Sequence, residues 1–127
     1  MELEALRTCC LAMKDTTESL PFDADTLVFK VWNKVFALTA FSAWEKGEPA
    51  VNLKCEPGKA SALRRKYEAV RPGYHMNKKH WNTVRLNTGE LSDAQVFAWV
   101  KESYQLVVKN LPKGIQAHPT GIDKPQP

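Results

Sequence analysis

The segment RPGYHMNKKHWN, residues 71–82, holds most of the side chains that could bind a charged partner. Its fixed cations and ionisable rings are Arg71, His75, Lys78, Lys79 and His80. The two histidines can gain charge in mildly acidic solution, and Asn77 adds hydrogen-bonding capacity. Pro72 and Gly73 favour a defined loop, and a rigid loop that presents cations can follow a phosphate backbone. The aromatic rings of this segment could instead pack on the sheet edge and hold the loop in place.

A second group of cations lies on alternating segments that read as strands. The alternation places Lys30, Lys54 and Arg85 on the face opposite the core, where Trp81 is also expected. Lys34 follows a predicted turn. Cations beside an aromatic ring suit phosphate contact with packing on a base or sugar. The alternative is a solvated polar face with lysines that discourage edge pairing. The predicted nucleic-acid-binding residues are Lys30, Lys34, Lys54, Arg71, His75, Asn77, Lys78, Lys79, His80, Trp81 and Arg85.

The positive charge is concentrated in the middle of the chain. The 127 residues carry 18 Lys+Arg and 14 Asp+Glu, a net charge of +4. Residues 51–90 hold nine basic and three acidic side chains, a net +6, whereas residues 1–50 have a net −3. This distribution favours a basic patch on a folded scaffold over a basic tail.

The sequence contains no motif that is typical of a metal site or a catalytic site. The three cysteines, Cys9, Cys10 and Cys55, form no CxxC pair, and no HExxH, P-loop or GxSxG string occurs. Nothing marks a nucleophile or an orienting carboxylate for His75 or His80. We therefore expect no metal, no cofactor and no catalytic residue, and we expect reduced thiols.

Composition indicates an ordinary globular chain of one domain. Apolar residues make up 43% and charged residues 25% of the sequence. The longest apolar run is far shorter than the roughly 20 residues that cross a bilayer, and the first residues do not resemble a secretory signal. We expect a cytoplasmic monomer with no membrane partner.

The elements that would position the cations follow from periodicity. Residues 2–18 and 57–70 read as amphipathic helices, and residues 51–55 and 81–87 as strands. Residues 26–42 predict a hairpin that reverses at Trp32-Asn33, with Leu27, Phe29 and Leu38 on the core face. A capping box from Ser92 to Gln95 begins a helix that stops before Pro112. We expect one domain over residues 1–111 and a flexible Pro-rich tail over 112–127.

Four strings in this order resemble the MmcQ/YjbR family: FKVWNKVFAL, VNLKCEP, RPGYHMNKKHWNTVRL and SYQLVVKNLP. The resemblance covers roughly residues 1–112. It implies an α+β fold of frataxin-like topology, in which an antiparallel sheet of about five strands packs against N- and C-terminal helices plus a middle helix. It also implies a double-wing mode of binding double-stranded DNA. The chain departs from the family at Trp32-Asn33, where small turn residues are common, and in its Pro-rich tail.

The sequence thus predicts a module that binds double-stranded DNA through its backbone and shape. No helix carries a stripe of Arg, Asn and Gln, so no readout of base sequence is indicated. The alternative is a protein-interaction or small anionic ligand module, in which Trp32, Tyr74 and Trp81 line a patch beside the same lysines.

Overall fold

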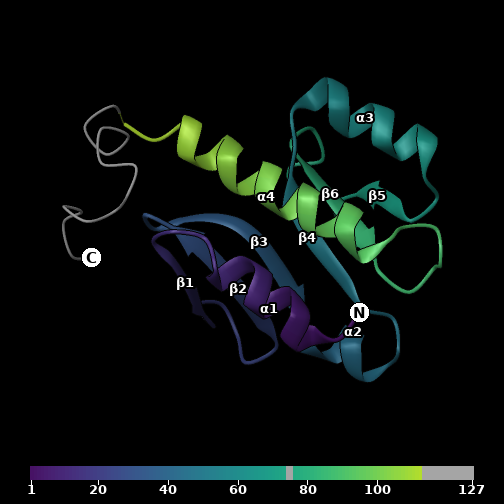
Figure 1. Ribbon diagram of the computed structural model, residues 1–127, viewed down its shortest axis with the longest axis horizontal. Helices are drawn as coiled ribbons and strands as arrows, with labels where there is room; N and C mark the ends of the chain where they lie inside the picture. The colour runs from purple at the N-terminus through teal and green to yellow at the C-terminus, as the bar shows by residue number, and fades with distance from the viewer. Residues whose placement is uncertain (74–75, 113–127) are drawn as a thin grey trace.

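The computed structural model describes residues 1–73 and 76–112, which form four helices and one six-stranded sheet (Figure 1). In chain order the elements are α1 (Leu3–Leu11), β1 (Thr16–Ser19), β2 (Thr26–Val31), β3 (Lys34–Ala40), α2 (Phe41–Glu45), β4 (Ala50–Lys54), α3 (Pro57–Lys66), β5 (Val70–Pro72), β6 (Trp81–Arg85) and α4 (Asp93–Lys109). No helix within these described ranges has the length and apolar character required to cross a membrane.

The sheet is antiparallel, and the three longer helices cover one of its faces. Its strand order is β1-β2-β3-β4-β6-β5. Figure 1 shows α1 and α4 side by side against the sheet, with α3 next to β5 and β6. Side chains such as Leu6, Phe29, Val51 and Val100 form the buried core between these layers. The α+β prediction is confirmed, with six strands where about five were expected.

The predicted hairpin reversal at Trp32-Asn33 is confirmed. Both residues have positive φ, 49° for Trp32 and 66° for Asn33, as a two-residue turn that matches the twist of its strands requires. A tryptophan in this backbone region is uncommon. Its indole packs partly against the core cluster, and we infer that this contact offsets the local strain.

The prediction that Leu38 faces the core is wrong, because β3 carries a bulge. Phe29 pairs with Ala37, but the next residue of β2, Lys30, pairs with Val35, so Phe36 is the extra residue. Phe36 and Ala37 are both buried in the core cluster. Leu38 is therefore on the opposite face, where it pairs with Asn52.

The hydroxyl of Ser103, on α4, joins β3 to β4 beside this bulge. The register of the two strands pairs Ala37 with Leu53, so the next pair would join Phe36 to Lys54. Instead, the Lys54 N–H donates to Ser103 Oγ at 2.8 Å, and Ser103 Oγ donates to the Phe36 carbonyl oxygen at 2.6 Å. The serine thus supplies both partners that the ladder lacks at this point.

Both of the first two predicted helices are shorter than expected, and a short strand follows each. The helix predicted over 2–18 ends at Leu11, and the chain turns through Asp15 at φ 62° into β1. An ion pair between Arg7 and Glu18 joins the helix to that strand. The helix predicted over 57–70 ends at Lys66 because Tyr67 is extended, and residues 70–72 form β5.

The start of α4 agrees only in part with the predicted capping box. Ser92 Oγ accepts the Gln95 N–H at 3.1 Å, as expected. The Gln95 side chain does not return to the cap, because its Nε2 donates to the Tyr67 hydroxyl at 2.9 Å. Gln95 therefore joins α4 to the residue that ends α3.

We predict that Ser103→Ala lowers the free energy of unfolding by about 2 kcal/mol, because it leaves a backbone donor and a backbone acceptor without partners in the interior. Urea denaturation would measure the change. Ser61→Ala, on the exposed side of α3, is the matched control and should change stability by less than about 0.5 kcal/mol. Equal losses in the two variants would contradict the bridging role of Ser103.

Candidate nucleic-acid interface

The strand register brings several of the predicted cations to one end of the sheet. Strand β2 ends at Val31, which pairs with Lys34 at the start of β3. From the pair Ala37–Leu53, β3 runs back to Lys34 while β4 runs on to Lys54, which pairs with Trp81 at the start of β6. We call this region the basic end, and it comprises Lys30, Lys34, Lys54, Lys78, Lys79 and His80.

Backbone hydrogen bonds fix the loop that carries Lys78 and Lys79. The Asn77 carbonyl accepts the N–H groups of His80 and Trp81 at 3.1 and 2.9 Å, and its side-chain Oδ1 accepts the Lys79 N–H at 3.0 Å. The His80 carbonyl accepts the Cys55 N–H at 2.7 Å. Asn77 therefore shapes the loop, while both lysine side chains are exposed.

Arg64 supports this loop from α3, a role that the sequence did not indicate. Its Nε donates to Asn82 Oδ1 at 2.7 Å, and its guanidinium also donates to the Lys78 carbonyl. Asn82 is only 2% exposed and donates to the Ala60 carbonyl at 3.3 Å. In the sequence, Arg64 is the first of three consecutive basic residues, and nothing there distinguishes it from Arg65 or Lys66.

Two predicted cations lie away from the basic end. Arg85 pairs with Ala50 at the opposite end of β4 and β6. Arg71 is on the edge strand β5 opposite Thr83, and its Nε donates to the Glu68 carbonyl at 3.0 Å. Local alternation placed Arg85 on the correct face but could not show that the antiparallel order separates it from Lys54, and Arg71 was expected in a loop and not on a strand. His75 and Tyr74 lie outside the described residues.

Two further lysines join the basic end. Lys14 comes two residues before Thr16, which pairs with Val31, and the Tyr104 hydroxyl donates to the Lys14 carbonyl at 2.7 Å. Lys109, at the end of α4, lines a hollow of about 230 Å³ together with Lys54 and His80. Two acidic residues, Asp15 and Glu56, lie in the same region. Cations therefore outnumber acidic groups there.

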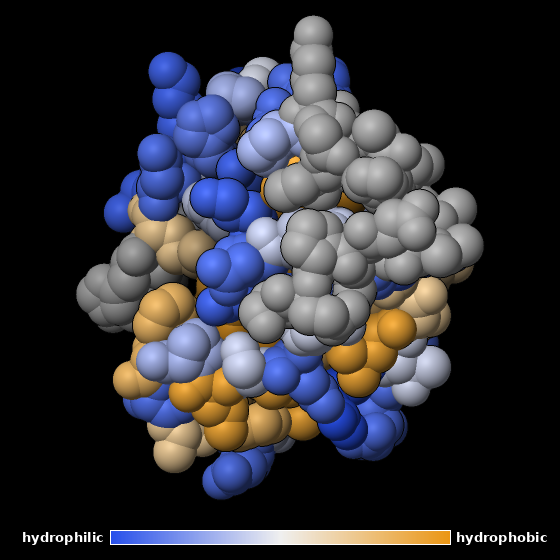
Figure 2. Space-filling view, turned by 90° about the vertical axis from the view of Figure 1, so that its left-hand side faces the viewer, coloured by the Kyte–Doolittle hydropathy of each residue, from blue (hydrophilic) through white to orange (hydrophobic). Residues whose placement is uncertain are grey.

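The helix-free face of the sheet holds a groove of about 680 Å³ with a mostly apolar lining. Leu38, Thr83 and Trp81 form part of its surface, and so does Phe22, a residue that is 70% exposed. On the side that it presents, Figure 2 shows hydrophobic residues gathered in the lower part and hydrophilic residues at the upper left. Trp32 does not line this groove as the alternative prediction requires, because it packs against the core on the other face.

The thiols are free, and their surroundings disfavour the thiolate. Cys10 is fully buried in the core, and this burial raises its pKa well above the ordinary value. Partial burial also raises the pKa of Cys9 and of Cys55, against the opposing effect of a nearby lysine in each case. Within residues 1–73 and 76–112, no three His, Cys, Asp or Glu side chains gather in a way that could hold a metal ion.

Comparison with known proteins identifies the family. The YjbR family model matches residues 11–106. An Escherichia coli K12 protein, called uncharacterized protein YjbR, is 36% identical over 113 residues, which cover 89% of this chain and 92% of that protein. The chain belongs to the YjbR family. The MmcQ/YjbR resemblance is thus confirmed.

Other relatives of the YjbR family agree with this assignment. The YbdF protein of Escherichia coli O157:H7 is 40% identical over 93 residues, 73% of each chain. A crystal structure from Deinococcus radiodurans, described with the domain DUF419, has a TM-score of 0.84 at 30% identity and covers 98% of this chain and 94% of its own. A Pseudomonas syringae protein gives a TM-score of 0.70 at 29% identity, over 84% and 98% of the two chains. The YjbR fold therefore extends over the described chain.

We predict that Gly73→Ala disturbs the loop of the basic end. A Cβ at Gly73 would lie 2.8 Å from Trp81 Cβ and 3.0 Å from the Trp81 carbonyl oxygen, so the backbone must move apart. The expected loss of stability is about 1–3 kcal/mol, with a change in tryptophan emission. Gly58→Ala is the control, because nothing lies within 4 Å of the added Cβ. A neutral Gly73→Ala would show that the loop is not held this closely.

Proposed function

We propose that the protein binds double-stranded DNA through contacts of the basic end with the phosphate backbone. The observation that carries this proposal is the register of β2, β3, β4 and β6, which gathers Lys30, Lys34 and Lys54 beside the loop of Lys78 and Lys79. The loop is already ordered by its hydrogen bonds, so its lysines lose little backbone freedom on binding.

The size of the basic end is suited to a short stretch of duplex. Four neighbouring strands, spaced about 4.8 Å apart, span roughly 15 Å. A duplex carries one charge per about 1.7 Å of its axis, so about nine phosphates fall along this length, and about half of them face one side. Simultaneous contact with about five phosphates is therefore reasonable.

The arrangement of the helices favours contacts without readout of base sequence. The buried faces of α1 and α4 pack on the sheet, so neither helix projects from the basic end toward a groove of the duplex. The β2–β3 turn and residues 76–80, just before β6, lie at this end and would serve as two wings. Lysines on such wings recognise charge and shape, and Asp15 and Glu56 limit the affinity.

We predict a steep dependence of DNA binding on salt. With about five phosphates neutralised, the logarithm of the binding constant should fall against the logarithm of the salt concentration with a slope of about −4 to −5. Titration of the protein with a short duplex at several salt concentrations, followed by tryptophan fluorescence, gives this slope. A slope near zero, or no binding at about 50 mM salt, would remove the proposal.

We also predict that the position of the charge matters more than its amount. Lys78→Ala with Lys79→Ala should weaken duplex binding by about tenfold while leaving the melting temperature almost unchanged, because both side chains are exposed. Lys46→Ala with Arg85→Ala removes the same charge near the opposite end of the sheet and should weaken binding far less. Equal effects of the two pairs would indicate attraction by net charge alone.

A second candidate function is supported by the apolar groove and the exposed Phe22. Such a surface is suited to an acidic peptide or a nucleotide, whose apolar or flat part would lie on Trp81 while its charges meet the lysines. The same fluorescence titration separates the two functions. Saturation by short acidic peptides or nucleotides with no response to duplex would favour the second.

A further inference from the structure

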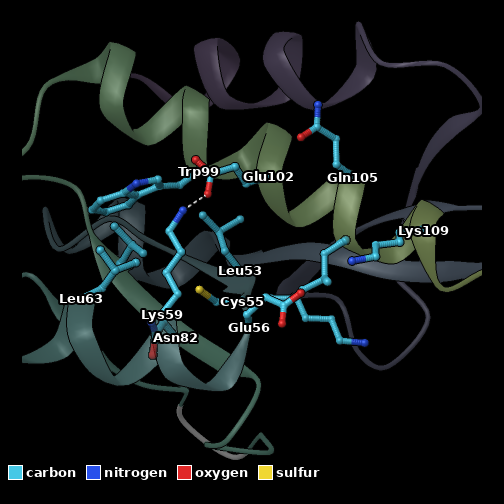
Figure 3. A pocket seen from close by; sticks show the side chains of 13 residues that line it. Leu53, Cys55, Glu56, Lys59, Leu63, Asn82, Trp99, Glu102, Gln105 and Lys109 are labelled. Carbon is cyan, nitrogen blue, oxygen red and sulfur yellow. Dashed lines mark hydrogen bonds and ion pairs between the residues drawn. The ribbon is translucent and has the colours of Figure 1, made fainter.

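A pocket of about 260 Å³ lies between α3 and α4 and shares Lys54 with the surface that the proposed DNA contacts use (Figure 3). Its floor is formed by Leu53 and Val84, which are 3% and 2% exposed. Leu63 from α3 and Trp99 from α4 form one side. Its lining is largely apolar, as is common in small-molecule sites.

Side-chain contacts between the α3 region and α4 border the pocket in two places. At one side, Tyr67 and Trp99 meet edge to face with ring centroids 5.6 Å apart, and Gln95 donates to the Tyr67 hydroxyl. Nearer the basic end, an ion pair between Lys59 and Glu102 crosses from helix to helix, and Cys55 points into the space beneath it (Figure 3). The space is thus bounded by specific side-chain contacts.

The pocket adjoins a polar hollow at the basic end. Lys54, Cys55, Glu56, Leu106 and Lys109 line both cavities, and the second cavity adds His80. A molecule that enters would place an apolar part against Leu53 and Val84 and its other end among cationic groups. Glu56 is the acidic group common to the two cavities, while Glu102, which also lines the pocket, is paired with Lys59.

We propose that this pocket binds a small carboxylate with an apolar body, which lies between α3 and α4 while its carboxylate meets Lys54 at the basic end. The volume is just below that of drug-sized sites, which indicates a ligand of about ten non-hydrogen atoms. A medium-chain fatty acid has this size and this distribution of polarity. The inference does not rest on DNA binding, because the apolar floor and walls have no part in the proposed DNA contacts.

The test compares three molecules that share an eight-carbon chain and differ in their head group: sodium octanoate, octan-1-ol and octylamine. Each is titrated into the full chain with labelled methyl groups, and the NMR signals of Leu53, Val84 and Leu106 are followed. Octanoate should shift these signals in a saturable way and bind more tightly than octanol. Octylamine should bind at least about tenfold more weakly than octanoate, because the head group would meet like charge.

Two variants test the role of the cation. Lys54→Met should weaken octanoate binding about three- to fivefold and leave octanol binding unchanged. Lys101→Met removes the same charge from an exposed position on α4 outside the pocket and should have no effect on either ligand. Octanoate should also slow alkylation of Cys55, read site by site by mass spectrometry, if it occupies the space into which the thiol points.

Three results would overturn the proposal. The first is the absence of saturable shifts with octanoate up to about 1 mM. The second is binding of octylamine as tight as that of octanoate. The third is a set of shifts centred on Leu38 and Met76 in the groove of the open face. Loss of DNA binding in the Lys78/Lys79 variant with octanoate binding intact would show that the two sites act separately.

Discussion

The arrangement of the sheet depends on two hydrogen bonds of Ser103, which join β3 to β4 beside the bulge at Phe36. At the bulge of β3 the backbone of Phe36 leaves the ladder, so its carbonyl and the Lys54 N–H would both be without partners. A helix hydroxyl that accepts from one and donates to the other satisfies both inside the protein. The bulge in turn places Phe36 and Ala37 in the core and Leu38 on the open face, where it contributes to the apolar groove.

The concentration of cations at one end is tolerated because the fold keeps their charged groups near solvent. Lys34, Lys78 and Lys79 are exposed, and repulsion between exposed charges is weak beyond the screening length of about 10 Å at moderate salt. The supporting contacts are made by other groups, such as the Arg64 guanidinium and the Asn77 side chain. Lys34, Lys78 and Lys79 therefore contribute little to the stability of the fold.

Sequence reasoning succeeded where the signal is local and failed where it depends on distant residues. The Trp32-Asn33 reversal and the cap at Ser92 follow from a few neighbouring residues, and both were predicted correctly. The bulge at Phe36 depends on a serine 67 residues away, so the face of Leu38 could not be read from alternation. Likewise, the addition of Lys14 to the basic end and the separation of Arg85 from it follow from strand pairing, and the addition of Lys109 follows from where α4 ends.

The two short strands that the sequence did not reveal form the two edges of the sheet. An exposed edge strand offers unpaired backbone groups on which another chain can add a strand. Here the edges are β1, of four residues, and β5, of three residues, and β5 ends in a proline that has no N–H to donate. Such edges are poor templates for the pairing of strands between molecules.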